Sequence, residues 1–281
     1  MLRAMRTFFD GTRPGRPVSV GSASFELPIQ YYRDDAFVLF FPAPLAALER
    51  ALPTPRLKPV PLLPGRGAVA IAAFNYLNTS IGPYGEVAVA IPVTLDRRAP
   101  PLVGALLESR FPSLGLFVCH LPVTHLVARD AGRGIWGYPK FVADMRFEYT
   151  PERLGCSLSE EGQHILSVEV ARGGLCVEER RPIVTYTVKG RELVRTIIPA
   201  RGTARLNLGA RGCSLRLGEH PVAESIRALG LGARPVFARY YVERAAILPV
   251  GEVVDGDVAP HEGYRGRERQ GVHDTVYLGG E

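Results

Sequence analysis

Short segments in which apolar and polar residues alternate make up most of the chain. In the clearest of them, 86–93, four valine or isoleucine residues alternate with Glu86, Ala88 and Ala90. Alternation with a period of two is typical of a β-strand that buries one face. Turn-forming residues at 161–162, 172–174 and 189–190 predict hairpins between strand-like segments. Further strands are predicted at 37–41, 68–74, 114–119, 141–149, 205–217 and 236–248.

Helix signals are few. One helix is predicted at 46–52, closed by Pro53, and another at 220–229, with Pro221 in its first turn and Gly230 after its end. A third short helix is expected in the mixed stretch before Arg133. Because strands and helices do not alternate as in a doubly wound sheet, the pattern predicts an α+β, β-rich fold. We expect an antiparallel sheet that closes, or nearly closes, on itself and carries the short helices on its outside.

The two ends of the chain lack these patterns. Residues 1–25 contain several glycines and prolines and are predicted to form an irregular arm. From Gly251 to 281 the chain is polar and glycine-rich, which predicts a flexible tail or an arm that packs on a partner subunit. The length of 281 residues would allow two domains, but a β-rich chain of this size can also be one, and we expect a single domain over 1–281.

Composition and charge exclude several classes of protein. The chain is 46% hydrophobic and 22% charged, as globular proteins are. Its net charge of +6 comes from arginines scattered among acidic residues, which argues against a nucleic-acid partner. The longest apolar segment, 37–48, is too short to span a membrane, and no apolar signal segment follows Met1, so we expect a cytoplasmic protein without a membrane partner. Histidines and cysteines lack the spacing of metal ligands, and no metal or cofactor is expected.

Lysine is rare, which draws attention to Lys140. Only three of the 34 basic residues are lysines, and a lysine amine, unlike a guanidinium, can lose its proton and act as a nucleophile. Lys140 ends a stretch that holds three glycines, Tyr138 and Trp136, the chain's single tryptophan. If these rings form an apolar wall, removal from water disfavours the charged amine, and a neutral amine can attack a ketone.

The residues alone leave a second interpretation open at both candidate positions. If a strand begins at Tyr138, Lys140 shares a charged, solvated face with Asp144 and Arg146. Glu86 can likewise be a solvated strand end, or a carboxylate that borders a cavity left by the small side chains of its own face and shuttles protons there.

Three segments resemble the acetoacetate decarboxylase family. The sequence Gly-Tyr-Pro-Lys at 137–140 resembles the lysine motif of that family, and 82–86 is similar to its G-x-Y-x-E segment. The stretch 31–33 resembles the region that holds an active-site arginine. The resemblance implies that Lys140 forms a Schiff base and that Glu86 is an acid/base or orienting carboxylate. It further implies that Arg33 binds a carboxylate or joins the network, with Tyr138 and Trp136 as substrate-binding walls.

The resemblance also implies a cone-like antiparallel β-barrel that assembles into a homo-oligomer and acts on a small oxo acid. The expected function is that of a carbon–carbon lyase that decarboxylates a 3-oxo acid such as acetoacetate through an iminium ion on Lys140. Two positions depart from the family: Phe141 stands where a second lysine is common, and Ile71 where a second glutamate is expected. These departures keep two alternatives open, an aldolase-dehydratase acting on pyruvate and an aldehyde, and a catalytically silent barrel that binds a small acid.

Overall fold

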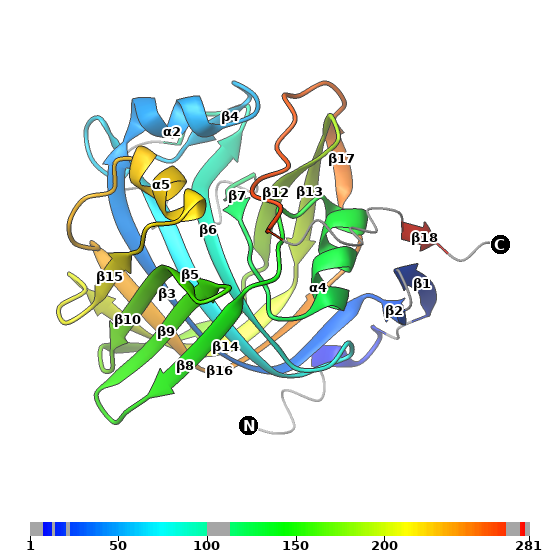
Figure 1. Ribbon diagram of the computed structural model, residues 1–281, viewed down its shortest axis with the longest axis horizontal. Coiled ribbons are helices and arrows are strands. Elements are labelled where there is room, and N and C mark those ends of the chain that lie inside the picture. Colours follow the sequence, from blue (N-terminus) through cyan, green and yellow to red (C-terminus); the bar gives the residue numbers. More distant parts are fainter. Residues whose placement is uncertain (1–7, 13–14, 21–22, 100–112, 268–275, 279–281) are drawn as a thin grey trace.

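Strands dominate the computed structural model, which describes residues 8–12, 15–20, 23–99, 113–267 and 276–278 (Figure 1). The largest sheet is antiparallel except between β7 and β12, and the short strand β4 (Leu57–Pro59) joins it by pairing with β6. In spatial order its main strands are β11 (Leu175–Glu179), β14 (Ala200–Leu208), β16 (Phe237–Leu248), β3 (Ile29–Pro44), β5 (Arg66–Thr79), β6 (Tyr84–Leu95), β7 (Gly115–His120), β12 (Ile183–Lys189), β13 (Glu192–Ile198) and β17 (Glu252–Asp255).

Two smaller sheets and three short α-helices complete the described part of the chain. One sheet has the order β15 (Ser214–Leu217), β10 (Gln163–Ala171), β9 (Arg153–Glu160), β8 (Asp144–Tyr149), and the other β18 (Val276–Leu278), β1 (Arg16–Val20), β2 (Ala23–Leu27). The helices are α2 (Leu45–Ala51), α4 (Leu126–Ala131), which continues into the π-helical turn η2 (Gly132–Trp136), and α5 (Pro221–Ala228). None of the helices in these described ranges has the length and apolar character needed to cross a bilayer.

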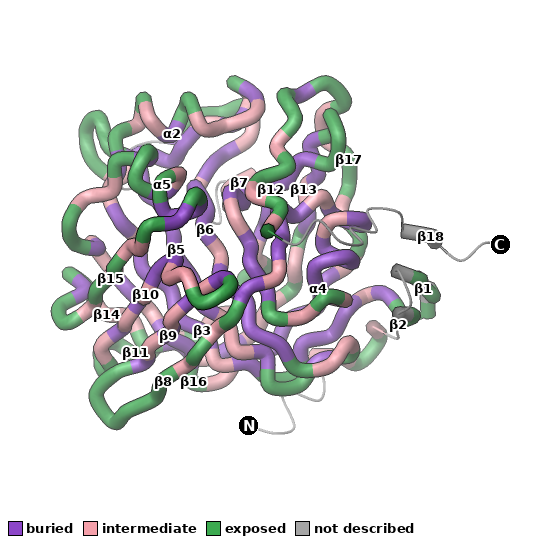
Figure 2. Tube along the Cα trace, viewed as in Figure 1, coloured by how far each residue is buried: buried purple, intermediate pink, exposed green. Residues whose placement is uncertain are grey.

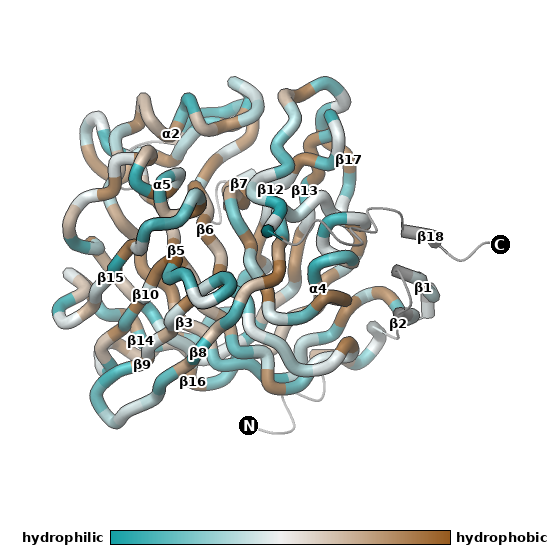
Figure 3. The backbone as a smooth tube through the Cα atoms, viewed as in Figure 1, coloured by the Kyte–Doolittle hydropathy of each residue, from teal (hydrophilic) through white to brown (hydrophobic). Residues whose placement is uncertain are grey.

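The main core lies between the large sheet and the β8–β10 sheet. Val87, Val89 and Ile91 of β6 point into it, and Leu158 and Val168 reach it from the smaller sheet. The central strands are largely buried, and hydrophobic residues concentrate on them (Figures 2 and 3). The alternation predicted for 86–93 is therefore confirmed, because Glu86, Ala88 and Ala90 face a cavity on the opposite side of the sheet.

The large sheet curls around this cavity. Side chains from β3, β5, β6, β7, β12 and β16 all line it, so strands far apart in the sheet face one another across it. Among the described residues, however, no pairing joins the outermost strands β11 and β17. The β-rich character is confirmed, whereas the closed barrel that the resemblance implied is not.

Several predicted elements differ from the observed ones. The strand predicted at 141–149 is observed as β8, which begins only at Asp144. Lys140 therefore lies before the strand and not in it. The segment 172–174 does not close a hairpin, because β10 and β11 belong to different sheets. The predicted strand 205–217 is two strands, β14 and β15, separated by a turn at which Ala210 has a φ of 46°. Gly209 and Gly212, which both have a positive φ, mark this turn in the sequence, and the prediction missed that signal.

Both ends are more ordered than predicted. The expected arm 1–25 contains β1 and most of β2, which pair with each other, while residues 1–7, 13–14 and 21–22 lie outside the described residues. The expected flexible tail contains β17, which pairs with β13, and the segment after it packs on the body of the chain up to residue 267. There Tyr264 contacts the Phe141 ring and donates a hydrogen bond to Glu160 at 2.6 Å. These contacts correct the prediction of a flexible tail for 251–267.

Candidate active site

A cavity of about 140 Å³ opens on the inner face of the curled sheet. One end is rich in polar side chains and the other is lined by small and apolar ones. The polar lining residues are Tyr31, Tyr76, Glu86, Tyr138, Lys140, Thr185, Arg239, Tyr241 and Arg244. A space of this size holds a small organic molecule in contact with water-excluding walls.

Lys140 and Glu86 meet at the polar end. The Lys140 Nζ lies 2.7 Å from Glu86 Oε2, and the two side chains are only 5% and 9% exposed. The solvated interpretation of both residues is therefore wrong.

A short segment between β7 and α4 joins the two residues in space. Val123 bridges Glu86 on one side and Val142 on the other, and its N–H donates to the Phe141 carbonyl at 2.9 Å. This pairing places the start of β6 beside the segment that carries Lys140. Residues 54 positions apart in the sequence thereby come into contact.

The turn before Lys140 leaves room for its side chain at Gly132. A Cβ atom at that position would lie 2.5 Å from Lys140 Cδ and 2.7 Å from its Cε. Gly132 is the first residue of η2, and π-helical turns often occur at functional sites. At the other end of η2, Gly137 has a φ of +69°, and a Cβ there would lie 2.5 Å from the Val188 carbonyl oxygen. A Cβ at Gly132 would therefore displace the Lys140 side chain, and one at Gly137 would collide with the backbone of β12.

Tyrosines surround the ion pair. The Tyr76 hydroxyl donates to Glu86 Oε1 at 3.0 Å, leaving Oε2 for Lys140, and the hydroxyls of Tyr31 and Tyr84 lie 3.0 Å apart. Burial raises the pKa of Tyr31, Tyr76 and Tyr84 well above the usual value for a phenol, and the negative charge of Glu86 adds to this effect. These hydroxyls therefore stay neutral: Tyr76 donates to Glu86, and within the Tyr31–Tyr84 pair one hydroxyl donates to the other.

A second buried ion pair borders the cavity. Arg244 Nη1 lies 2.6 Å from Asp34 Oδ2, with side-chain exposures of 5% and 0%. The guanidinium stands over the Phe74 ring at 5.2 Å, and its Nε is buried without a hydrogen-bond partner among the described residues. Burial opposes the charge on Arg244, but Asp34 raises its pKa above the usual value, so it is a permanent cation in the cavity wall.

Two bulges direct these side chains toward the cavity. In β16 the pairing with β14 shifts at Val242, so that cavity-lining positions change from Arg239 and Tyr241 to Arg244 and Ala246. In β3 the pairing with β5 shifts twice between residues 31 and 34. Bulges that change the direction of side chains are common next to active sites.

The structure brings together three of the five site residues proposed from the sequence. Lys140, Glu86 and Tyr138 all line the cavity, and the Tyr138 hydroxyl lies 2.8 Å from that of Thr185. Trp136 is 1% exposed and donates to the Pro249 carbonyl at 2.7 Å, outside the cavity, so it supports the turn and does not form a substrate wall. Arg33 is exposed and does not line the cavity, because the bulge in β3 turns the neighbouring Asp34 inward instead.

The two positions that depart from the family pattern face away from the cavity. Phe141 and Ile71 are both fully buried in the main core on the other side of the sheet. Sequence reasoning missed Arg244, a charged residue at the start of an apolar strand segment, and Asp34, which lies in a run of charged residues at 33–35 and has no distinguishing local signal. Tyr76, which holds Glu86, was also missed, because tyrosines in strands are usually part of a core.

Comparison with known structures agrees with this fold. An acetoacetate decarboxylase structure matches with a TM-score of 0.62 at 17% identity, covering 81% of this chain and 89% of the other. The acetoacetate decarboxylase of Legionella pneumophila matches with a TM-score of 0.61 at 17% identity, covering 89% and 94%. The enduracididine biosynthesis enzyme MppR, complexed with the condensation product of pyruvate and imidazole 4-carboxaldehyde, matches with a TM-score of 0.59 at 12% identity, covering 82% and 90%. At these identities the likeness is one of fold.

The family assignment comes from the sequence comparison. No curated protein matches the chain, but the model of the family described as acetoacetate decarboxylase (ADC) matches residues 15–258. This match contains both the Lys140 and the Glu86 motifs and every strand that lines the cavity. The chain therefore belongs to the acetoacetate decarboxylase family.

Proposed function

We propose that the protein is a carbon–carbon lyase that decarboxylates a 3-oxo acid through an imine on Lys140. The observation that carries this proposal is the buried contact between Lys140 Nζ and Glu86 Oε2 inside a largely apolar cavity. Membership of the family, whose solved members include acetoacetate decarboxylases, supports it.

The first step requires a neutral amine. Transfer of one proton from the Lys140 ammonium to the Glu86 carboxylate, across 2.7 Å, gives an amine and a carboxylic acid and leaves the net charge of the pair unchanged. The amine attacks the ketone carbon of the substrate, and the nitrogen passes one of its protons to the oxygen. Glu86 returns its own proton to the same oxygen, which leaves as water while the protonated imine forms. Tyr76 holds the Glu86 carboxyl in position for both transfers through its other oxygen.

The protonated imine then accepts the electron pair of the breaking bond. Carbon dioxide leaves and the pair becomes the double bond of an enamine. One proton taken up from water, directly or by way of the Glu86 carboxylate, then restores the protonated imine, which water hydrolyses to the ketone and free Lys140. Arg244, with its unpartnered Nε, is placed to orient the substrate carboxylate. Because Asp34 already balances its charge, Arg244 can hold the carboxylate without opposing its loss as carbon dioxide.

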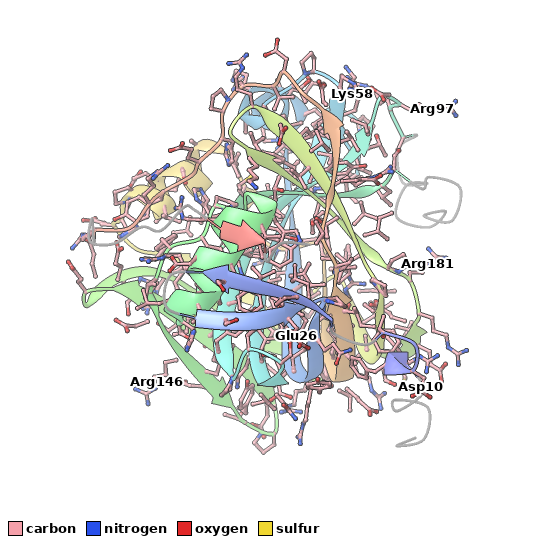
Figure 4. All side chains as sticks on the ribbon, turned by 90° about the vertical axis from the view of Figure 1, so that its right-hand side faces the viewer. Asp10, Glu26, Lys58, Arg97, Arg146 and Arg181 are labelled. Carbon is pink, nitrogen blue, oxygen red and sulfur yellow. The ribbon has the colours of Figure 1, made fainter. Side chains whose placement is uncertain are left out.

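Borohydride trapping tests the proposal directly. Reduction in the presence of acetoacetate is expected to leave a stable adduct on the peptide that contains Lys140, detected by mass spectrometry. Of the other two lysines, Lys189 is exposed and Lys58 is partly exposed, at the upper margin of the molecule in Figure 4, and neither lines the cavity. A Lys58→Arg/Lys189→Arg variant is therefore the matched control and should be labelled as the parent is, whereas Lys140→Arg should not. Labelling of Lys140→Arg to the same extent would refute the proposal. Absence of any adduct on the parent would also refute it and would favour a protein that binds a small acid without catalysis.

One observation favours a second reaction of the same imine. Phe141 places no second cation next to Lys140, and a fold neighbour, MppR, is complexed with a condensation product of pyruvate. An imine formed with pyruvate can become an enamine that attacks an aldehyde and then loses water. Carbon dioxide release from acetoacetate and product formation from pyruvate plus an aldehyde distinguish the two reactions.

We also propose that the chain assembles into a homo-oligomer. Large apolar side chains are exposed near the sheet edges, with Leu175 at 62%, Leu208 at 68% and Val253 at 54% exposure. Light scattering coupled to size-exclusion chromatography measures the molar mass, and a strictly monomeric species at micromolar concentration would refute this.

A further inference from the structure

The cavity continues beyond the polar residues into an extension lined by alanines. Five of them belong to adjacent strands of the large sheet and point to the same face: Ala36, Ala70, Ala72, Ala88 and Ala90. Four of them pair directly across neighbouring strands, Ala72 with Ala88 and Ala70 with Ala90. Facing pairs of the smallest apolar side chain leave a groove where larger side chains would fill the space.

The groove leads away from the reactive pair. On β6 the same face carries Glu86, then Ala88, then Ala90. The Cα atoms of Glu86 and Ala90 are four residues apart along the strand, or about 13 Å. Val38 and Leu116 form its sides, and the Phe40 ring, stacked on Phe237 at 4.2 Å, borders its far part. Apart from Glu86, the side chains named here offer no polar atom. Arg239, which pairs with Val38, and Tyr241 line the outer margin of the cavity, and both donate hydrogen bonds to Glu179.

These features fit one kind of occupant. A ketone held by Lys140 and a carboxylate near Arg244 occupy the polar end, so what enters the groove is the substituent on the other side of the ketone. For acetoacetate that substituent is a methyl group, which would leave most of the apolar wall without contacts. Building on the proposed function, we propose that the substrate is a 3-oxo acid whose ketone carries an extended apolar substituent, seated in the alanine groove.

A substrate series tests this with the unmodified protein. The specificity constant kcat/KM for carbon dioxide release is compared between acetoacetate and 3-oxohexanoate, which differ by two methylene groups. Because each buried methylene is worth about fourfold, 3-oxohexanoate is expected to be about tenfold better or more. Equal or lower kcat/KM for 3-oxohexanoate would overturn the proposal.

Variants that fill the groove provide the second test. In Ala72→Leu and Ala90→Leu the ratio of kcat/KM for 3-oxohexanoate to that for acetoacetate is expected to fall at least tenfold. Ala228→Leu, at an exposed position of α5, is the control and should keep the parent ratio. If a leucine variant does not fold, Ala72→Val fills less of the groove and should still lower the ratio several-fold. An unchanged ratio in the folded variants would overturn the proposal.

Failure of this inference can be told apart from failure of the proposed function. Borohydride trapping with both acids comes first. If neither acid labels Lys140, the proposed function fails and the inference falls with it. If both acids label Lys140 but acetoacetate is the better substrate, the proposed function stands and only the apolar substituent is refuted.

Discussion

The substitution Gly132→Ala separates the geometry of the site from the stability of the fold. Gly132 has helical dihedral angles, φ −61° and ψ −45°, so alanine fits the backbone and is favoured there by about 1 kcal/mol over glycine. The new Cβ, however, would lie 2.5 Å from Lys140 Cδ. Carbon atoms that are not bonded approach to about 3.5–4.0 Å, so the lysine side chain must move by about 1 Å or more.

This displacement should abolish the contact between Lys140 Nζ and Glu86 Oε2, which is 2.7 Å long in the parent. A misplacement of about 1 Å at a reacting group costs on the order of 100-fold in rate. We therefore expect Gly132→Ala to lower the rate of borohydride trapping with acetoacetate about 100-fold. The free energy of unfolding should stay within about 1 kcal/mol of the parent, because only a flexible side chain has to move.

The matched control is Gly256→Ala, where an added Cβ would have no atom within 4 Å. This variant should trap substrate at the parental rate. The trapping rate is followed by mass spectrometry of the Lys140 peptide after quenching at timed intervals, and stability by denaturant unfolding. A folded Gly132→Ala protein that is labelled within twofold of the parental rate would refute the argument that packing at Gly132 positions the lysine.

Three further predictions concern buried groups. Glu86→Gln removes the proton acceptor and should lower kcat on a 3-oxo acid by about 10²–10⁴, measured by carbon dioxide release; a loss under threefold contradicts its role as acid and base. Arg244→Gln leaves Asp34 buried without its cation and should cost about 3–5 kcal/mol in denaturant unfolding, and adding Asp34→Asn should recover part of this loss. Burial first, and then two neighbouring histidines, lower the pKa of His120 to about 4. The unfolded chain takes up that proton at its usual pKa of about 6.5, so stability should fall by at most about 3 kcal/mol as the pH drops through this interval. His120→Gln should flatten that part of the curve, and a curve identical to the parental one would show that another group causes the acid loss.

Local features of the fold were predictable because they depend on neighbouring residues. The alternation at 86–93 correctly separated the core face from the face that borders the cavity. The helix predicted at 220–229 is confirmed as α5, with His220 as its N-cap and Gly230 at a φ of +71° after its end. The turn residues correctly predicted the β9–β10 and β12–β13 hairpins, in which strands adjacent in sequence pair with each other.

The errors occur where pairing partners lie far away in the sequence. The connection 172–174 contains the same turn residues as a hairpin, but β11 pairs with β14 because the chain crosses from one sheet to another there. Likewise, nothing in residues 251–267 shows that Tyr264 will pack on Phe141. Partner choice depends on burial across the whole molecule, which local composition does not contain.

By itself the sequence determined the strand-rich architecture, the inward face of β6 and the lysine–glutamate pair of the family, all of which follow from alternation or short motifs. Only the tertiary structure decided that Arg244 and Asp34, 210 residues apart, form the second ion pair, and that Arg33 is excluded from the cavity. The physical reason is the β-bulge: one extra residue in a strand reverses which side chains face inward. Whether a bulge forms depends on how two distant strands fit together, and periodicity within one strand does not reveal this.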